Sequence, residues 1–472
     1  MEKIIVNPVT RISGFMEIEV HVENNVVVDA QTKGLLLRGF EQMLVGRSPF
    51  DAVYFTQRIC GICSTAHAMA SSLALEDALH IQVSEQGKYL RDILHGCEFL
   101  QNHIRHFYQY TVPDYVKLPT VHPLDNEHDD YRLPEKINKR ISDNYFKSLK
   151  VSRLAHEMLS VLGGKAPHNH GIFVGGIAAA ATTDKIIKMK SLLQEILVFI
   201  NEQMLPDAYS IAEYYPDYFK MGNSFGNLLS FGVFNHYKEL GTLYVDPLVF
   251  TVNKDGKGGI IKPFNQKNLT ENIDYSWYKG AKNEYTPTEI TTTPDMSNPK
   301  AYSWVKAPRY NNLPYEVGPL ARLWLTGEYR NGLSAMDRTL ARAIEAKKIA
   351  EILTILLDSL LPNIFVQEKY EAPQHAEGSG LIDTTRGALG HWLKIENKVI
   401  SFYQIITPSA WDFSTRDTNY RGTAEEAVIG TKIRDMKQPV ELGRILRSFD
   451  PCMSCATHVY SPGHETTTIR IL

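Results

Sequence analysis

Two Cys-x-x-Cys pairs stand near opposite ends of this 472-residue chain and contain four of its five cysteines. The pairs are Cys60-Gly61-Ile62-Cys63 and Cys452-Met453-Ser454-Cys455. The i, i+3 spacing directs two thiolates to one point from a single turn of backbone, so two such turns supply four soft sulfur ligands. If one metal site uses both pairs, the two ends of the chain must meet inside the fold.

The residues alone leave the metal open. Two Cys-x-x-Cys pairs most often form a structural tetrathiolate zinc site, and a dithiol redox centre is the second possibility. Structural zinc usually holds a small local module together, which argues against zinc between two distant ends of a large protein. A thioredoxin-like role needs a βαβ context that neither motif has.

Composition excludes several classes of protein. The chain is 43% hydrophobic and 22% charged, which is typical of a globular protein with a large core. Its 50 basic and 53 acidic residues nearly cancel, so charge gives no reason to expect nucleic acid or an anionic membrane as a partner. The charged N-terminal sequence lacks the apolar core of a signal peptide, and no run of about 18 apolar residues predicts a membrane span.

Periodicity predicts an α+β fold that is predominantly helical, with a central bundle of long helices and peripheral β-hairpins. Apolar and polar residues alternate over 16–31 and 392–406, which predicts two hairpins. The segment 254–299 is rich in Gly, Thr, Asn, Lys and Pro, and we expect a long surface excursion there, at an interface. Helical periodicity dominates at 64–82, 87–110, 185–215 and 336–361.

Both cysteine pairs have neighbours with chemical roles. Cys60 and Cys63 precede a helix-forming run, so the helix dipole and free N–H groups favour thiolates there, and Arg58 is expected to add positive charge. His67 falls on the same helical face and is predicted to donate to a bound thiolate, although a buried core histidine is the plainer interpretation. Asp450 places a carboxylate beside Cys452, where it is expected to accept a proton or orient an arginine.

These motifs resemble the large, catalytic subunit of nickel-iron hydrogenases. Arg58 to Cys63 with His67, and Asp450-Pro451-Cys452-x-x-Cys455-x-x-His458, look like that family's two nickel-ligand signatures. Further blocks match in order, so the resemblance spans essentially the whole chain and is most similar to the uptake, membrane-bound type. These blocks are residues 163–176, 302–322, 386–392 and 403–411.

The resemblance implies a nickel-iron centre. In this family four thiolates hold nickel, and the second cysteine of each pair also bridges to an iron that carries cyanide and carbon monoxide. Cys60 and Cys452 would then be terminal on nickel, while Cys63 and Cys455 would bridge. Soft sulfur suits both metals, and an open position at nickel lets hydrogen bind. The implied reaction is heterolytic, reversible cleavage of H2 to protons and electrons, with Cys452 as first proton acceptor.

The resemblance also assigns residues around this centre. Arg386 is expected over the open site as a fixed cation, and the hydroxyl of Ser409 is expected to hydrogen-bond a cyanide ligand. Glu41 and His458 correspond to the family's ligands for a separate magnesium or iron ion near the C-terminus. That ion would hold in place the chain end that bears two nickel ligands.

Three positions depart from the family pattern. Ser13 stands where the family usually has a glutamate that takes the proton from the terminal cysteine, and a serine can relay a proton through water but cannot store one. Asn102 replaces a carboxylate often found there, and Thr385 replaces the proline before the active-site arginine. We therefore expect protons to leave through Ser13 and water, or through Asp450.

The tail after His458 also fits the family, in which a nickel-dependent endopeptidase removes such an extension once the metals are in place. We therefore expect residues 1–458 to form a single catalytic domain and residues 459–472 to be cleaved on maturation. An ordinary flexible terminus is the alternative.

Electron transfer requires a partner, because Cys97 is the one remaining cysteine and is predicted to lie in the core. The family supplies an iron-sulfur small subunit with a twin-arginine export signal. Co-export predicts a heterodimer at the periplasmic or outer face of the membrane, with a membrane cytochrome or other electron acceptor; a cytoplasmic location is the alternative.

Two other functions remain open at this stage. A regulatory H2 sensor would have the same site, but sensors usually lack a cleavable tail. The second alternative is a zinc-stabilised structural subunit of a respiratory complex. Relatives of the family in respiratory complexes, however, have generally lost the nickel cysteines.

Overall fold

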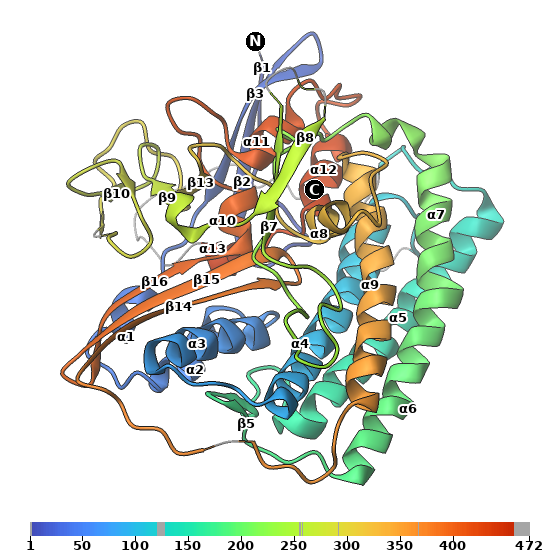
Figure 1. Cartoon of the computed structure of the whole chain (residues 1–472). Helices are drawn as coiled ribbons and strands as arrows, with labels where there is room; N and C mark the ends of the chain where they lie inside the picture. Colours follow the sequence, from blue (N-terminus) through green and yellow to red (C-terminus); the bar gives the residue numbers. More distant parts are fainter. Residues whose placement is uncertain are drawn as a thin grey trace.

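The computed structural model describes residues 2–119, 128–253, 256, 258–290, 292–366 and 368–456. Helices and small antiparallel sheets together give a mixed α+β fold, as the sequence predicted (Figure 1). The α-helices are α1 (Phe40–Leu44), α2 (Asp51–Thr56), α3 (Ser64–Leu79), α4 (Glu85–Arg105), α5 (Glu135–Gly163), α6 (Thr183–Phe199), α7 (Leu205–Tyr214), α8 (Pro319–Thr326), α9 (Ala335–Asp358), α10 (Pro408–Asp412), α11 (Thr423–Val428), α12 (Val440–Ser448) and α13 (Met453–Ala456).

The strands form short antiparallel sheets with mostly local connections. Both predicted hairpins are confirmed: β2 turns into β3 at Asn24 and Asn25, and β15 turns into β16 at Asn397 and Lys398, where all four residues have positive φ. The strands are β1 (Glu2–Val6), β2 (Met16–Glu23), β3 (Val26–Gly34), β4 (Ile172–Phe173), β5 (Gly176–Ile177), β6 (Leu228–Ser230), β7 (Leu248–Val252), β8 (Gly259–Pro263), β9 (Leu269–Asn272), β10 (Tyr278–Lys279), β11 (Glu284–Tyr285), β12 (Thr293–Pro294), β13 (Ala307–Tyr310), β14 (His375–Thr384), β15 (Gly387–Glu396) and β16 (Val399–Ile406).

Long helices pack together on one side of the molecule. Helix α4 contacts both α5 and α9, and α6 contacts the same two helices (Figure 1). The predicted helix at 87–110 is α4 followed by a turn of π-helix at His106–Thr111, and the one at 185–215 is α6, a π-turn and α7. Helix α5 was not predicted, because polar side chains such as Ser142, Asn144 and Ser148 occupy part of its buried face and obscure the apolar periodicity.

Helix α3 positions the first cysteine pair by packing directly under the β14–β15–β16 sheet (Figure 1). The close approach depends on small residues on both sides. A side chain at Gly378 would place its Cβ 2.3 Å from the Ala74 carbonyl oxygen, and one at Gly380 would come within 2.0 Å of the Ala70 oxygen. Because only glycine fits at these two positions, β14 holds α3, and the cysteine turn that precedes it, at a fixed depth in the core.

The segment 254–299 is more ordered than expected for a surface excursion. Among its described residues it contains the short strands β8 to β12, and β9 pairs with both β11 and β13. Ile273, Tyr278, Tyr285 and Ile290 form a small hydrophobic cluster with Trp304. The segment therefore folds around its own small core, which composition alone did not reveal.

The two ends of the described chain meet through backbone contacts. The N–H of Ser13 donates to the Pro451 carbonyl oxygen at 3.2 Å, and the N–H of Met453 donates to the Ser13 carbonyl oxygen at 2.7 Å. Gly14 has φ 84°, and a Cβ there would lie 2.4 Å from the backbone nitrogen of Ser454. The N-terminal loop thus packs against the turn that bears Cys452, at a distance that only glycine permits.

A buried carboxylate fastens the same two segments together. Asp114 accepts hydrogen bonds from Arg11 at 2.6 Å and from Arg447 at 2.6 and 2.7 Å. Burial alone would raise the pKa of Asp114, but the two guanidinium groups lower it well below its usual value. Asp114 therefore links the loop before Ser13 to α12, the helix that leads into the second cysteine pair.

No described helix is long and apolar enough to cross a membrane.

We predict that Asp114→Asn lowers the free energy of unfolding by about 3–5 kcal/mol at pH 7, because it leaves two buried arginines without their shared charge. The depressed pKa means that this contribution is complete above about pH 4 and is lost as the pH falls further, so the difference from wild type shrinks in acid. Urea unfolding of both proteins at pH 7 and at a pH below about 4 measures this difference in the free energy of unfolding. Asp143→Asn is the control, since its exposed pair with Lys139 contributes at most about 1 kcal/mol. Equal losses in both variants would contradict the assignment.

Candidate metal centre

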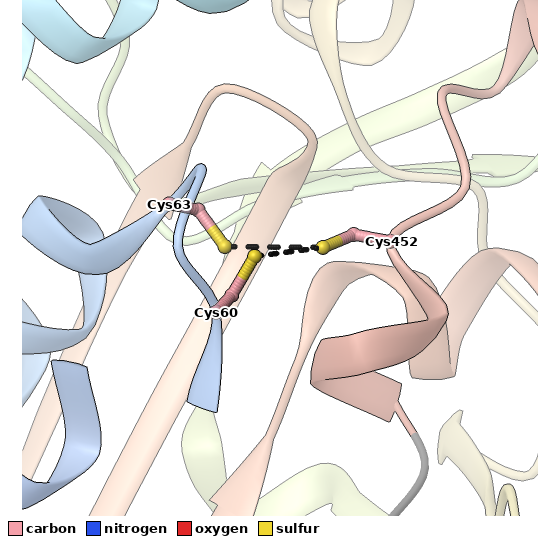
Figure 2. A group of neighbouring side chains, drawn as sticks. All are labelled: Cys60, Cys63 and Cys452. Atoms are coloured by element: carbon pink, nitrogen blue, oxygen red, sulfur yellow. Dashed lines mark hydrogen bonds between the residues drawn. The ribbon is translucent and has the colours of Figure 1, made fainter. Parts of the chain in front are cut away.

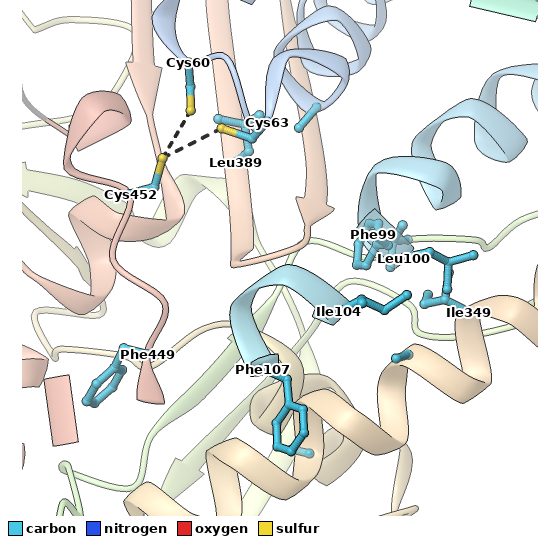
Figure 3. Packing of buried hydrophobic residues seen from close by; sticks show 14 of the residues in the cluster. Cys60, Cys63, Phe99, Leu100, Ile104, Phe107, Ile349, Leu389, Phe449 and Cys452 are labelled. Carbon is cyan, nitrogen blue, oxygen red and sulfur yellow. Dashed lines mark hydrogen bonds between the residues drawn. The ribbon is translucent and has the colours of Figure 1, made fainter. Parts of the chain in front are cut away.

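Three cysteine sulfurs converge in the core of the protein. Cys60 and Cys63 project from one loop toward Cys452 (Figure 2). The Sγ of Cys452 lies 3.3 Å from that of Cys60 and 3.9 Å from that of Cys63, and all three sulfurs lie within 4.8 Å of one another. All three are buried and belong to the same hydrophobic cluster as Phe99 and Leu100 of α4 (Figure 3).

This geometry fits one metal centre. Metal-thiolate bonds are about 2.3 Å for zinc, so two sulfurs on one ion are at most about 4.6 Å apart. The Cys452 sulfur lies closer than this to the sulfurs of both Cys60 and Cys63. Three thiolates would carry three negative charges into a dry environment, which is costly without cations. The donor set therefore suits a thiophilic metal. Cys455 falls in α13, but its side chain lies outside the described part of the structure, as does the whole of His458.

Local structure explains how the first pair is presented. Cys60 follows a turn of 3-10 helix, Gln57–Ile59, and has an extended backbone, while Cys63 is the N-cap residue of α3, as its spacing predicted. The side chain of Arg58, in the same turn, is exposed. The cation that links the two cysteine turns is Arg38, which donates to the carbonyl oxygens of Ile59 and Ser454.

Arg386 faces the sulfur cluster within a buried network. Burial opposes its charge, but Asp450 and the three cysteine thiolates raise its pKa well above the usual value. Its guanidinium donates to the Asp450 backbone oxygen at 2.8 Å, to the Asp450 carboxylate at 2.9 Å and to the Asn102 side-chain oxygen at 2.8 Å. These bonds fix the position of the cation relative to Cys452, two residues after Asp450.

Asn102 completes this network with both ends of its amide. Its oxygen accepts from Arg386, and its Nδ2 donates to the second carboxylate oxygen of Asp450 at 2.7 Å. A carboxylate at this position would face Asp450 with like charge, so the amide suits the neighbour that the chain has. Asp450 is buried, yet Arg386 and His106 lower its pKa well below the usual value. It is therefore suited to orienting Arg386 and poorly suited to holding a proton.

Two serines contact the cysteine turns. The Oγ of Ser13 lies 4.0 Å from the Cys60 sulfur and 3.5 Å from the Ser454 hydroxyl. The Oγ of Ser409, on α10, accepts the backbone N–H of Cys452 at 2.9 Å. Because the Ser409 oxygen acts as acceptor in that bond, its O–H can donate in another direction. Both serines thus lie at the site, as the sequence predicted.

His67 contacts a second histidine, which the sequence did not predict. Its Nδ1 lies 3.1 Å from Nε2 of His391 on β15, and the other ring nitrogen of His391 lies 2.8 Å from the Tyr403 hydroxyl. Burial lowers the pKa of His67 to about 4, so the ring is neutral at pH 7. The partner of its Nδ1 is therefore a second imidazole and not a thiolate.

Glu41 lies on α1 beside a second acidic group. One of its oxygens accepts the Ile405 N–H at 3.1 Å. Burial and the charge of Glu41 together raise the pKa of Glu271 to about 7. Glu271 accepts from Gln404 at 2.6 Å, and Lys306 lies 3.8 Å from it. A buried carboxylate at Glu271 near a half-buried one at Glu41 indicates a position that a cation would stabilise.

A family model described as nickel-dependent hydrogenase matches the chain at residues 38–127, 123–333 and 325–458. The chain belongs to the nickel-dependent hydrogenase family. The relatives include the periplasmic [NiFeSe] hydrogenase large subunit of Desulfomicrobium baculatum, which is 36% identical over 97% of this chain and 95% of its own length. The quinone-reactive Ni/Fe-hydrogenase large chain of Wolinella succinogenes is 30% identical and covers 100% of this chain and 98% of its own.

Solved structures of nickel-dependent hydrogenases have the same fold. The Desulfomicrobium baculatum [NiFeSe]-hydrogenase superimposes with a TM-score of 0.91 at 36% identity, covering 97% of this chain and 100% of its own. The Ni-Fe-Se hydrogenase of Desulfovibrio vulgaris Hildenborough gives 0.92 at 35% identity over 97% and 100% of the two chains. Although both of these enzymes are named for selenium, this chain has cysteine at all four positions of its two motifs.

Sequence reasoning missed several residues that shape this hydrogenase's site. His391, Glu98 and Asp114 were not singled out, because each acts through a partner that is distant in sequence. One signal was available: Arg91, His95, Glu98 and Asn102 recur every three or four residues along α4, and all are buried. A polar stripe at helical spacing along a largely buried helix indicates a buried polar network.

Proposed function

We propose that this chain is the catalytic large subunit of a nickel-iron hydrogenase that cleaves H2 heterolytically and reversibly to protons and electrons. The convergence of Cys60, Cys63 and Cys452 in the core is the observation that carries this proposal. Family membership supports nickel as the metal. The names of the relatives, which are large subunits or large chains, support a small-subunit partner, for which we propose an iron-sulfur protein.

Within this centre we propose terminal nickel ligands at Cys60 and Cys452 and bridging ligands at Cys63 and Cys455. The metals would supply an open coordination position where H2 binds and is polarised. An iron with cyanide and carbon monoxide ligands needs hydrogen-bond donors in a buried place. The hydroxyl of Ser409 is suited to that role, since its oxygen is held by the N–H of Cys452.

The chain's own groups would handle the proton. We propose that Cys452 accepts it first, being a buried thiolate in contact with Cys60. Ser13 lies beside Cys60 and would relay the proton through water toward Ser454. Asp450 would keep Arg386 in place over the cluster, since its depressed pKa makes it an ionised hydrogen-bond acceptor.

A second ion would fit near Glu41. We propose that Glu41 and His458 bind magnesium, or a second iron, and that Glu271 and Gln404 support it through water. The buried carboxylate of Glu271 near the half-buried Glu41 supports this proposal, and oxygen ligands are those that magnesium prefers.

The architecture and location extend the proposal. We propose that α4, α5, α6 and α9 act as a central helix bundle, and that residues 1–458 form one domain. We further propose export with the small subunit to the outer face of the membrane, where a cytochrome or other acceptor takes the electrons. The words periplasmic and quinone-reactive in the relatives' names support this location.

We predict about one nickel per purified large subunit, together with infrared bands of bound carbon monoxide and cyanide. Cys60→Ser and Cys452→Ser should each lose the nickel, because each removes a converging thiolate. Cys97→Ala is the matched control, since Cys97 is buried on α4 and should leave the nickel content unchanged. Zinc in place of nickel, or nickel without these bands, would refute the proposed function.

We predict that Ser13→Ala slows the hydrogen-deuterium exchange that the metal centre catalyses in H2 by at least about tenfold, because it removes the hydroxyl relay beside Cys60. Ser401→Ala, which alters an exposed serine on β16, should have no effect. Asp450→Asn tests the other predicted route by removing the carboxylate. Wild-type exchange rates in both Ser13→Ala and Asp450→Asn would rule out both routes.

We also propose that a maturation endopeptidase removes residues 459–472 after the metals are inserted. Intact-mass measurement of the metal-loaded protein should then give a chain that ends at His458. A metal-loaded, active protein that keeps all 472 residues would contradict this proposal.

A further inference from the structure

The first turn of α3 carries the bridging cysteine, and a residue of another helix caps it. Cys63 is the N-cap residue, and its side chain makes no capping hydrogen bond. An N-cap side chain ordinarily accepts the N–H of the second or third helical residue. Here these are Thr65 and Ala66, and both donate to the carboxylate of Glu98, at 2.7 and 3.1 Å.

The same turn is fastened on its other side by the loop that follows α5. The Oγ of Ser64 accepts the N–H of His168 at 3.0 Å, and the Oγ1 of Thr65 accepts from Asn169 at 3.2 Å. This loop lies in the block 163–176, which the sequence marked without a role. Two elements, α4 and this loop, therefore hold the start of α3, and Glu98 is the side chain among these contacts that can carry charge.

Glu98 must lie close to Cys63, because it occupies the place that a capping side chain of that residue would take. Its side chain is only 4% exposed. Burial raises the pKa of Glu98, the backbone N–H groups of Thr65 and Ala66 lower it, and the charge of Cys60 raises it again, to about 7. The carboxylate and the cysteine sulfurs thus interact electrostatically.

We propose that Glu98 is a positioning residue of the metal centre, whose carboxylate occupies the first amides of α3 so that the Cys63 sulfur is reserved for the metals. Hydrogen bonds to a ligating sulfur withdraw electron density from the metal and change its potential. By binding the two N–H groups, Glu98 prevents that withdrawal, and in its ionised form it adds a nearby negative charge. This inference rests on the proposed nickel-iron function.

The test compares Glu98→Ala and Glu98→Gln with wild type. In Glu98→Ala the two N–H groups are left to turn to the Cys63 sulfur, so the infrared bands of carbon monoxide and cyanide should shift to higher wavenumber. Glu98→Gln keeps one acceptor but loses the charge, so a smaller shift in the same direction is expected. Nickel content and thermal unfolding of the metal-free chain are measured in parallel, and Glu98→Ala should unfold at a lower temperature.

The matched control is Glu76→Gln. Glu76 is also a buried glutamate between α3 and α4: it pairs with Arg91 at 2.5 Å and accepts the Gly175 N–H at 2.8 Å. It lies 13 residues beyond Cys63, about 20 Å along the helix. This variant should lose stability but keep its nickel and the wild-type band positions.

The outcomes separate the two proposals. Shifted bands, or loss of nickel, in the Glu98 variants but not in Glu76→Gln would support the positioning role. Wild-type bands in both Glu98 variants, or equal nickel loss in Glu76→Gln, would overturn it. Absence of the bands from wild type would refute the nickel-iron function instead. The capping contact would then be tested by thermal unfolding of the metal-free chain. An unchanged unfolding temperature in Glu98→Ala would overturn it.

Discussion

The contact between the two chain ends is the constraint on which the rest of this structure depends. Backbone hydrogen bonds from Ser13 to Pro451 and from Met453 to Ser13 bring the N-terminal loop against the second cysteine turn. Gly14 permits that approach, and Asp114 binds Arg11 and Arg447 on either side of it. Because these bonds involve no metal, the fold itself brings Cys452 to the first cysteine pair.

Buried charge is the second constraint. A cluster of thiolates in the core would be unstable without compensating cations and hydrogen-bond donors. Arg386 supplies a fixed cation, Asp450 and Asn102 hold it, and Arg38 bridges the two cysteine turns. These groups come from the turn between β14 and β15, from α4, from the segment after α12 and from the N-terminal region, which explains why a site made by two short motifs needs a large protein around it.

Much of this arrangement could be predicted from the sequence, and the reasons for the misses are physical. The hairpins and α3, α4 and α9 follow from periodicity and turn residues, and the cysteine spacing predicted the shared site. Helix α5 was missed because polar residues fill part of its buried face. The contact between His67 and His391 was not predicted, because the two residues are 324 positions apart in sequence. Local sequence patterns do not reveal such pairs. The buried polar stripe of α4 indicates a polar network but does not identify the residues that it contacts.

X-ray absorption at the nickel edge tests the central claim most directly, because it counts the atoms bound to the metal. The account predicts nickel surrounded by sulfur, with four thiolate neighbours and iron as the next heavy atom. Nickel bound by nitrogen and oxygen, or a sulfur site that contains zinc alone, would contradict it.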